Sequence, residues 1–512
     1  MRNKFSARLS SVVIVAICML LLSGCETRNA RLGEYGLETL GLKYWVDGDN
    51  DSYRASVQDC KITFLGYVKI PSYIKYEGQK IPVTGIKYLG KKTRRVSIPE
   101  TVIEISSNAF SSTPIYNNPK NWENGVLYVN NNLIAVDHSL SGSYTIKEGT
   151  RIIADAAFSD CLNLDEVILP DGIITIGKDA FKGCQYISEI KIPHSTSHIG
   201  SSAFAGCTAL SEVFLPDSLK TIQKCTFENC GSLEKISIPA LVEEIKEDAF
   251  HQCSSLRCIE LPDNLRRIGD CAFASCKSLK SIDLPEGIWF VGKDVFYNSG
   301  IYNAPSNWSG NVLYVDHCLV DAKYSFEKYT ITVKQGTKII ADYAFDNDLG
   351  YLTSIYLPDG LHIIGEYAFS GVRKLRSVRL PSDLWYIGKD AFSGTSLSSI
   401  NIPKTINTLP MNVFSACYFK KIFIPDNIEY IGDRAFEYCR YLESITIPRN
   451  IKYVGAGAFT SCDNLTDIKY DGTCEEWKNV SKGESWNGVD YILQDPCPAT
   501  YVQCIDGIVN IE

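Results

Sequence analysis

Cysteine is the residue of this chain whose spacing most invites a chemical interpretation. Nineteen of the 512 residues are cysteine. Bound zinc needs converging thiolates, often from a Cys-x-x-Cys pair, and the closest local pairs, Cys225/Cys230 and Cys271/Cys276, lack that spacing. Nine cysteines stand three residues after a recurring phenylalanine: Cys161, Cys184, Cys207, Cys230, Cys253, Cys276, Cys417, Cys439 and Cys462. Side chains that project in parallel from stacked coils meet in a poor geometry for a disulfide. We predict a ladder of buried free thiols with no metal.

The sequence offers little for catalysis. It contains no Gly-x-Ser-x-Gly, His-Glu-x-x-His or phosphate-binding glycine-rich motif, and only six histidines. Its net charge of −8 disfavours nucleic-acid binding, which depends on Lys and Arg. We therefore expect no enzyme, no cofactor and no nucleic-acid partner. Among the other cysteines, Cys474, Cys497 and Cys504 could include one disulfide.

The elements that position these thiols repeat along the chain. Phenylalanine recurs about every 23 residues from Phe158 to Phe459, and proline after an apolar residue keeps the same period from Pro170 to Pro448. Such regularity indicates a solenoid, in which each coil buries its apolar face only against its neighbours. We expect about 16 coils, which at an inter-strand spacing of about 4.8 Å would extend over roughly 75–80 Å.

One coil can be interpreted residue by residue. The alternation in Leu279–Leu284 predicts a strand with Ile282 and Leu284 facing inward, and Pro285 ends it. Ile288–Gly292 predicts a second short apolar segment, in which the glycine allows a sharp turn. Asp294–Phe296 predicts a short helical or 3₁₀ turn whose Phe296 fills the interior of the coil.

The consensus LPxxLxxIGxxAFxxCxxLxxIxLP, found over about residues 60–512, resembles the leucine-rich repeat of BspA-like (treponemal-type) bacterial surface proteins. The resemblance implies a curved, right-handed solenoid on the cell surface. The best-known members attach to host matrix proteins or to other bacteria. The expected fold class is a β-rich leucine-rich-repeat solenoid with short helical or 3₁₀ turns and a cap at each end.

The domain boundaries follow from breaks in the repeat. We assign 36–98 to a β-rich N-terminal cap, 99–469 to the solenoid and 470–512 to a C-terminal cap, because terminal coils would otherwise expose their apolar cross-section. Two longer segments, at about 111–158 and 297–345, align with each other and each contain a hairpin pattern. They could be protruding ligand-contact hairpins or variant coils of the usual build, and we favour variant coils.

The first 24 residues have the pattern of a signal peptide. A basic start precedes an apolar run at 11–22, which is shorter than the roughly 20 residues of a membrane-spanning helix. Leu22-Ser23-Gly24-Cys25 resembles the bacterial lipobox, which implies that Cys25 is lipidated and that 25–35 is a tether. We expect an exported protein anchored by lipid to the bacterial outer membrane or the cell surface.

Three sets of outward positions are candidates for ligand contact. The acidic column contains Glu166, Glu189 and Glu212, and is followed by Lys235. The basic region contains Arg376, Arg379, Lys420 and Lys421. The aromatic column contains Phe290, Tyr386, Tyr430 and Tyr453, with Trp289 and Trp385 adjacent. Like charges in neighbouring rungs cost energy, so the charges either recognise a ligand or form a solvated face. The aromatics either contact a partner or pack on the next coil.

The leading functional hypothesis is binding or adhesion to a host or microbial surface macromolecule, with a protein favoured over a glycan. The alternatives are a glycan-binding accessory lipoprotein and an envelope-structural protein without an external ligand.

Overall fold

The computed structural model describes residues 37–39, 42–47, 54–60, 66–76, 78–323, 329–345, 351–487 and 497–511. The predicted signal peptide, Cys25 and the tether lie outside these residues. Within the described ranges, no helix is long and apolar enough to cross a membrane.

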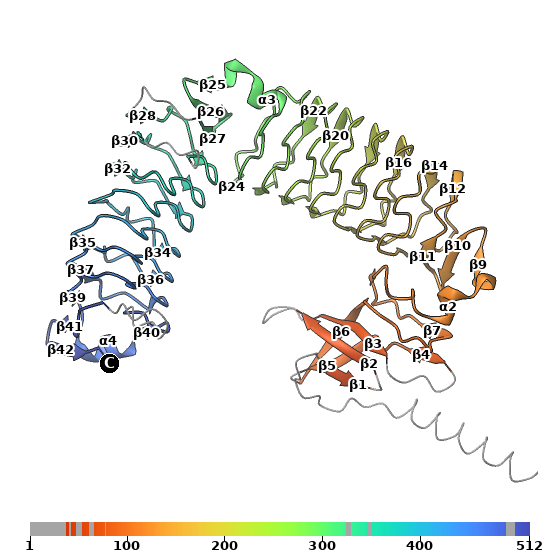
Figure 1. Ribbon diagram of the computed structural model, residues 1–512, viewed down its shortest axis with the longest axis horizontal. Helices are drawn as coiled ribbons and strands as arrows, with labels where there is room; N and C mark the ends of the chain where they lie inside the picture. Colours follow the sequence, from red (N-terminus) through yellow and green to blue (C-terminus); the bar gives the residue numbers. More distant parts are fainter. Residues whose placement is uncertain are drawn as a thin grey trace, which may run out of the picture.

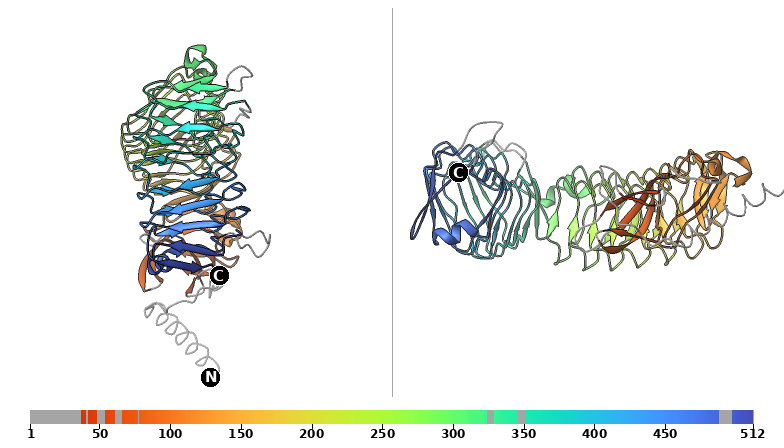
Figure 2. Two further views of the ribbon diagram at one scale, coloured as in Figure 1. Left: turned by 90° about the vertical axis from the view of Figure 1, so that its left-hand side faces the viewer. Right: turned by 90° about the horizontal axis from the view of Figure 1, so that it is seen from below.

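The chain winds into about 16 coils with a period of about 23 residues, which confirms the predicted solenoid. The coils stack into an open arch, with the N-terminal strands at one end and the C-terminal cap at the other (Figure 1). Seen from the side, successive strands of one limb lie as parallel rungs (Figure 2). The register is in phase with the repeat, since Thr175 pairs with His198 and Ile176 with Ile199.

Two-residue strands line the inner, concave side of the arch (Figure 1). They are β13 (Ile152–Ile153), β15 (Thr175–Ile176), β17 (His198–Ile199), β19 (Thr221–Ile222), β21 (Glu244–Ile245), β23 (Arg267–Ile268), β24 (Phe290–Val291), β29 (Ile339–Ile340), β31 (Ile363–Ile364), β33 (Tyr386–Ile387), β34 (Thr408–Leu409), β36 (Tyr430–Ile431), β38 (Tyr453–Val454) and β40 (Ser481–Lys482).

Longer strands lie on the outer, convex side (Figure 1). They are β12 (Ser141–Thr145), β14 (Asn163–Ile168), β16 (Glu189–Lys191), β18 (Glu212–Phe214), β20 (Lys235–Ser237), β22 (Cys258–Glu260), β28 (Thr330–Thr332), β30 (Ser354–Tyr356), β32 (Ser377–Arg379), β35 (Lys421–Phe423), β37 (Ser444–Ile447), β39 (Asp467–Tyr470), β41 (Tyr501–Cys504) and β42 (Gly507–Asn510).

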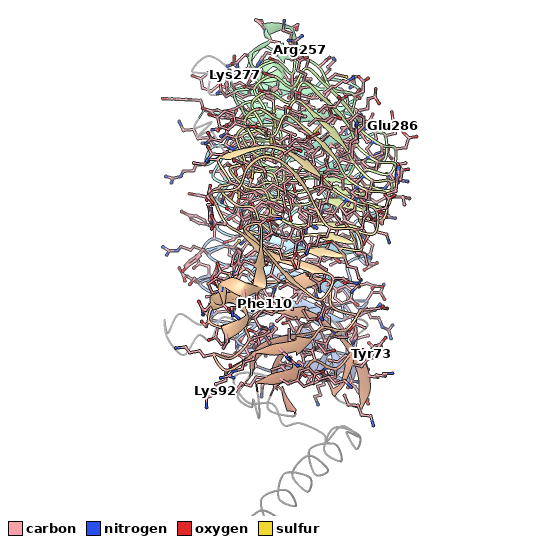
Figure 3. The ribbon with its side chains drawn as sticks, turned by 90° about the vertical axis from the view of Figure 1, so that its right-hand side faces the viewer. Tyr73, Lys92, Phe110, Arg257, Lys277 and Glu286 are labelled. Carbon is pink, nitrogen blue, oxygen red and sulfur yellow. The ribbon has the colours of Figure 1, made fainter. Side chains whose placement is uncertain are left out.

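Each coil therefore has two faces and two flanks. A proline turn joins the convex strand to the concave strand, and the phenylalanine and cysteine segment returns the chain. Figure 3 shows Lys277, which follows Cys276, and Glu286, which follows Pro285, at opposite flanks, with Phe110 inside the body. The phenylalanine rings stack along the interior with centroids 4.9 Å apart for Phe158 and Phe181 and 5.4 Å apart for Phe250 and Phe273.

Two sequence expectations for the coil differ from the structure. The segment around each repeat phenylalanine forms tight turns instead of a helical or 3₁₀ turn. Residues such as Asp294 (φ 54°), before Phe296, and Asn298 (φ 56°), after it, adopt the left-handed conformation. Gly292 does not have a positive φ. It is needed because a Cβ there would lie 2.7 Å from the backbone nitrogen of Asp270 in the preceding coil.

The strand expected at 279–284 is also absent from the described ladders. Ile282 and Leu284 are nevertheless buried, and Ser281 and Asp283 are exposed, as the alternation predicts. The following segment is one of the two longer ones, and the convex ladder resumes only at β28, so this coil has no regular strand partner on that side.

The two longer segments form inserted hairpins that join the concave sheet. The first consists of α2 (Pro114–Asn117), a 3₁₀ turn η1 (Pro119–Asn121), β9 (Trp122–Glu123), β10 (Val126–Val129) and β11 (Asn132–Val136). The second consists of α3 (Gly300–Asn303), η2 (Pro305–Asn307), β25 (Trp308–Ser309), β26 (Val312–Val315) and β27 (Cys318–Ala322). β11 pairs in parallel with β13, and β27 with β29.

Each hairpin divides the interior of the arch. Along β26, Leu313 belongs to the core of the preceding coils, whereas Val312 and Tyr314 belong to the core of the following coils. β10 alternates in the same way between the N-terminal core and the central one. Because successive strand residues point to opposite faces, each hairpin forms a partition, and the two partitions separate three apolar cores.

The ends of the arch carry different elements. The N-terminal strands are β1 (Leu37–Thr39), β2 (Leu42–Asp47), β3 (Arg54–Cys60), β4 (Tyr67–Lys69), β5 (Tyr73–Tyr76), β6 (Gln79–Ile86), β7 (Arg95–Ser97) and β8 (Glu104–Ile105). At the other end, α4 (Cys474–Asn479) begins with a capping box formed by Thr473 and Glu476. β41 pairs in parallel with β39 and is followed by β42.

Candidate binding surfaces

The nine repeat cysteines are all buried free thiols. Most donate a hydrogen bond to the carbonyl of the repeat phenylalanine in the preceding coil, as Cys276 does to Phe250 O at 3.1 Å. Burial raises the pKa of each thiol above its ordinary value of 9.0, to about 11 for Cys161 and about 12 for Cys276. A protonated, inaccessible thiol is a poor nucleophile or ligand, so this ladder fills space and saturates carbonyl groups.

The acidic column lies on the convex face. Glu189 and Glu212 are register partners on β16 and β18, and Glu166 lies one coil earlier on β14. Lys191 Nζ is 3.0 Å from Glu189 Oε1, and Ser143 Oγ donates to Glu166 Oε2 at 2.7 Å. These local partners offset part of the repulsion among the three carboxylates.

The basic region also lies on the convex face but is not continuous. Arg379 ends β32, and Lys421 begins β35 two coils later. Between them, the side chain of Asn401 exchanges hydrogen bonds with the backbone N–H and carbonyl of Leu380, and the coil around it has no strand. Arg376 precedes β32 and Lys420 precedes β35, so each strand presents two cations.

Exposed aromatic side chains that sequence reasoning missed lie beside these cations. Tyr356 is the register partner of Arg379 and is 63% exposed, and Phe423, two residues after Lys421, is 61% exposed. Both occupy the last position of a convex strand. The signal was available, because the equivalent outward position of β18 also holds an exposed aromatic, Phe214.

The aromatic column lies on the opposite, concave face and separates into groups. Tyr430 and Tyr453 are register partners, and Tyr453 donates to Asp433 Oδ1 at 3.3 Å. Phe290 is half-buried beneath Arg267, whose guanidinium carbon lies 3.8 Å from its ring centroid. Tyr386 pairs with the buried Ile363. The charged sets and the aromatic set therefore cannot contact one small ligand together.

Trp289 and Trp385 border a recess of about 280 Å³ on the concave side of the second hairpin. Glu286, His317, Lys338 and His362 also line it. Sequence analysis named the two tryptophans and missed the four polar residues. Lys338 and His362 occupy the same repeat position as the two tryptophans, immediately before a two-residue strand. An alignment of the repeats could therefore have identified them, but not Glu286 or His317.

The C-terminal cap brings two of its three cysteines together. The ligand atoms of Cys474, Cys504 and Asp506 lie within 4.8 Å of one another, and the backbone N–H of Cys474 donates to Asp506 Oδ1 at 2.7 Å. Burial raises the pKa of Cys504 to about 12. Cys497 lies apart and donates to Leu465 O at 3.3 Å. All three are free thiols.

Stacked coils with interior phenylalanine and cysteine ladders define a leucine-rich-repeat solenoid with extended surfaces for binding. The model of the BspA type leucine rich repeat region matches the chain in six copies, over residues 88–187, 131–257, 243–309, 322–420 and 408–481. The chain belongs to this BspA-type leucine-rich-repeat family, as the resemblance in its sequence predicted.

Solved leucine-rich-repeat structures are also similar. A leucine-rich repeat protein from Bacteroides ovatus ATCC 8483 is 24% identical, with 88% of this chain and 99% of that chain covered and a TM-score of 0.34. A leucine rich cell surface protein from Faecalibacterium prausnitzii A2-165 is 23% identical, with 88% and 98% covered and a TM-score of 0.28. The pneumococcal vaccine antigen PcpA is 18% identical, with 89% and 99% covered and a TM-score of 0.24. No curated protein matches the chain.

Proposed function

We propose that this protein is an exported, lipid-anchored surface protein that binds another protein, on a host or microbial surface, through its convex face. The repeat family supplies extended surfaces for such binding, and the lipobox-like sequence ending at Cys25 supports the anchor. The role is one of binding and adhesion, without catalysis.

One observation carries the choice of the convex face. Tyr356 and Arg379 stand side by side and exposed on β30 and β32, and Phe423 and Lys421 repeat the combination on β35. Tyrosine, phenylalanine and arginine are enriched at protein interfaces. The cations add selectivity for a partner with an acidic surface.

Binding is tested with the purified full chain in detergent against immobilised extracellular matrix proteins and mucins. The variants are Tyr356→Ser, Phe423→Ser and Arg379→Glu, and we expect each to weaken binding at least tenfold. Tyr186→Ser is the matched control, because Tyr186 is 61% exposed but belongs to no set described above. Equal binding by all four variants would exclude this face, and failure to bind any member of the panel would contradict the proposal.

The anchor is tested separately on intact cells. The wild-type chain should incorporate a radiolabelled fatty acid and be cleaved by added protease, whereas Cys25→Ala should incorporate none. Lipid labelling of the Cys25→Ala variant would refute the assignment of the anchor, and protease resistance on whole cells would refute surface exposure.

A further inference from the structure

The recess beside the second hairpin is assembled from successive rungs of the concave sheet. The backbone N–H of Lys338 donates to His317 O at 2.8 Å, that of His362 to Lys338 O at 2.8 Å, and that of Trp385 to His362 O at 3.0 Å. Since rungs are about 4.8 Å apart, His317 and Trp385 lie roughly 14 Å apart along the arch. Trp289, which immediately precedes β24, also borders the recess.

One polar atom in this recess has no partner. His317 is only 8% exposed, and its Nε2 is buried without a hydrogen bond to any described residue. Its other ring nitrogen, Nδ1, lies 3.5 Å from Asp316 Oδ2. A buried polar atom left unpaired costs about 1–3 kcal/mol, and such atoms are uncommon in native structures. Because Nε2 has no accessible surface, a ligand in the recess would reach it after a rotation of the His317 side chain, and the new hydrogen bond would then recover that cost.

The first hairpin provides an internal comparison. Its backbone repeats the second one, down to the bond from the N–H of Asp155 to Ile105 O, which matches that from Asp342 to Val291 O. The recess residues differ, however. In the places of Trp289, His317, Lys338, His362 and Trp385, the first hairpin region has Ile103, Asn131, Arg151, Ile174 and Ser197. The hairpin architecture therefore does not require the two indoles and two imidazoles of the second site.

Exposure distinguishes these indoles from the tryptophans of the two hairpins. Trp122 and Trp308 pack within the hairpins and donate their indole N–H to Tyr116 O and Tyr302 O. Trp289 and Trp385 are instead 37% and 46% exposed. Large apolar rings left in water beside polar groups are typical of ligand sites.

We propose that this recess binds a neutral oligosaccharide, with sugar rings against Trp289 and Trp385 and a hydroxyl group hydrogen-bonded to His317 Nε2. A pyranose has an apolar C–H face that packs on an indole and a rim of hydroxyl groups. A hydroxyl both donates and accepts, so it pairs with Nε2 in either imidazole tautomer. His362 supplies further hydrogen-bonding capacity at the rim.

Charge favours a neutral ligand over an anionic one. Lys338 Nζ, the one permanent cation among the residues that line the recess, forms an ion pair with Glu286. Asp316 adds a carboxylate beside His317. An apolar protein side chain is a poorer fit than a sugar, because it would leave Nε2 without a hydrogen bond. The site does not rest on the protein-binding proposal, which concerns the convex face.

Isothermal titration calorimetry of the full chain tests the site, with cellohexaose, maltohexaose, mannohexaose and chitohexaose as probes and hyaluronan as the charged comparison. At least one neutral hexasaccharide should bind more tightly than hyaluronan. Trp289→Ala and Trp385→Ala should each weaken that binding at least tenfold, and His317→Leu should weaken it several-fold.

Trp45→Ala is the matched control, because Trp45 is 51% exposed on β2, outside the recess, and should leave the affinity unchanged. Tyr356→Ser should also leave it unchanged, which separates this site from the convex face. The proposal is overturned if none of the four neutral probes binds, if hyaluronan binds most tightly, or if binding survives both recess tryptophan substitutions. Unchanged melting temperatures of the variants would show that lost binding is not lost folding.

Discussion

The cysteine ladder predicts that the solenoid loses stability in mild alkali. Burial raises the pKa of every ladder thiol above 9.0, so the folded state holds the neutral thiol and the unfolded chain ionises first. A group whose pKa is raised by folding contributes stability that is complete below its unfolded pKa and is lost as pH rises toward its folded pKa. For this ladder, the loss begins near pH 9 and continues toward pH 12.

The size of the effect follows from the two pKa values. At pH 10, a thiol with an ordinary pKa of 9.0 is mostly ionised, whereas one with a pKa of about 12, such as Cys207, is almost wholly protonated. The difference removes between about 1 and 2 kcal/mol of stability per thiol relative to pH 7. Nine thiols lose on the order of 10 kcal/mol, which is comparable to the whole stability of a typical domain.

Another coil of the chain indicates which substitution to use for the control variant. Val372 fills the cysteine slot in another coil and is buried there, so valine is accepted at this position. We compare wild type with the triple variant Cys207→Val, Cys230→Val and Cys253→Val, all in one core. Guanidinium unfolding is followed by circular dichroism at pH 7, 9 and 10 with a reducing agent.

Between pH 7 and pH 10, the triple variant should lose about 4 kcal/mol less than wild type, because three ionisations are removed. Its stability at pH 7 can differ through packing alone, so the comparison concerns only the change with pH. Identical pH dependence in the two proteins would refute the reasoning, as would labelling of Cys230 by iodoacetamide in the folded protein as fast as that of the exposed Cys258.

Three further predictions follow from the coil contacts, the second hairpin and the C-terminal cap. Gly292→Ala should destabilise the fold by about 1–3 kcal/mol in guanidinium unfolding, because its Cβ would overlap backbone, whereas Gly231→Ala, with its nearest atom 3.7 Å away, should cost little. Burial raises the pKa of Asp342 to about 7, so stability falls as pH rises from near 4, where the carboxyl of the unfolded chain ionises, to about 7, where that of the folded chain does. Asp342→Asn keeps the acceptor for the backbone N–H of Glu366, so it should be more stable than wild type by up to about 4 kcal/mol at pH 8 and should differ little from it at pH 4. The oxidant diamide should remove two hydrogens and form a disulfide between Cys474 and Cys504, which peptide mass mapping would detect. Disulfides between ladder cysteines in place of this one would contradict the geometry of the C-terminal region.

The repeat architecture could be predicted because the local sequence of each coil shows which side chains face inward and where the chain turns. Inward positions, turn residues and period recur often enough that a single copy can be checked against a dozen others. The errors were local. A glycine in an apolar segment was assigned a conformational role, but only the distance to the preceding coil shows that Gly292 is needed for close approach.

The candidate recess could be predicted only in part. Trp289 and Trp385 were noticed because they adjoin the aromatic column. His317 was missed because its neighbours depend on the pairing of β27 with β29, and that pairing is set by how the hairpin enters the sheet. The arch also places the charged and aromatic sets on opposite faces, which sequence spacing alone does not reveal.

The two hairpin partitions have a mechanical consequence. A coil of a solenoid is stabilised by its immediate neighbours, and loss of one coil exposes the next. At each partition, the side chains on one surface belong to a different core from those on the other. When unfolding of the coils on one side reaches a hairpin, the hairpin is therefore still held by the intact core on its other side. Under tension between the proposed lipid anchor and a captured ligand, the arch should yield in three separate extensions. A bound protein could thus be held while one segment is pulled open and the others keep their folds.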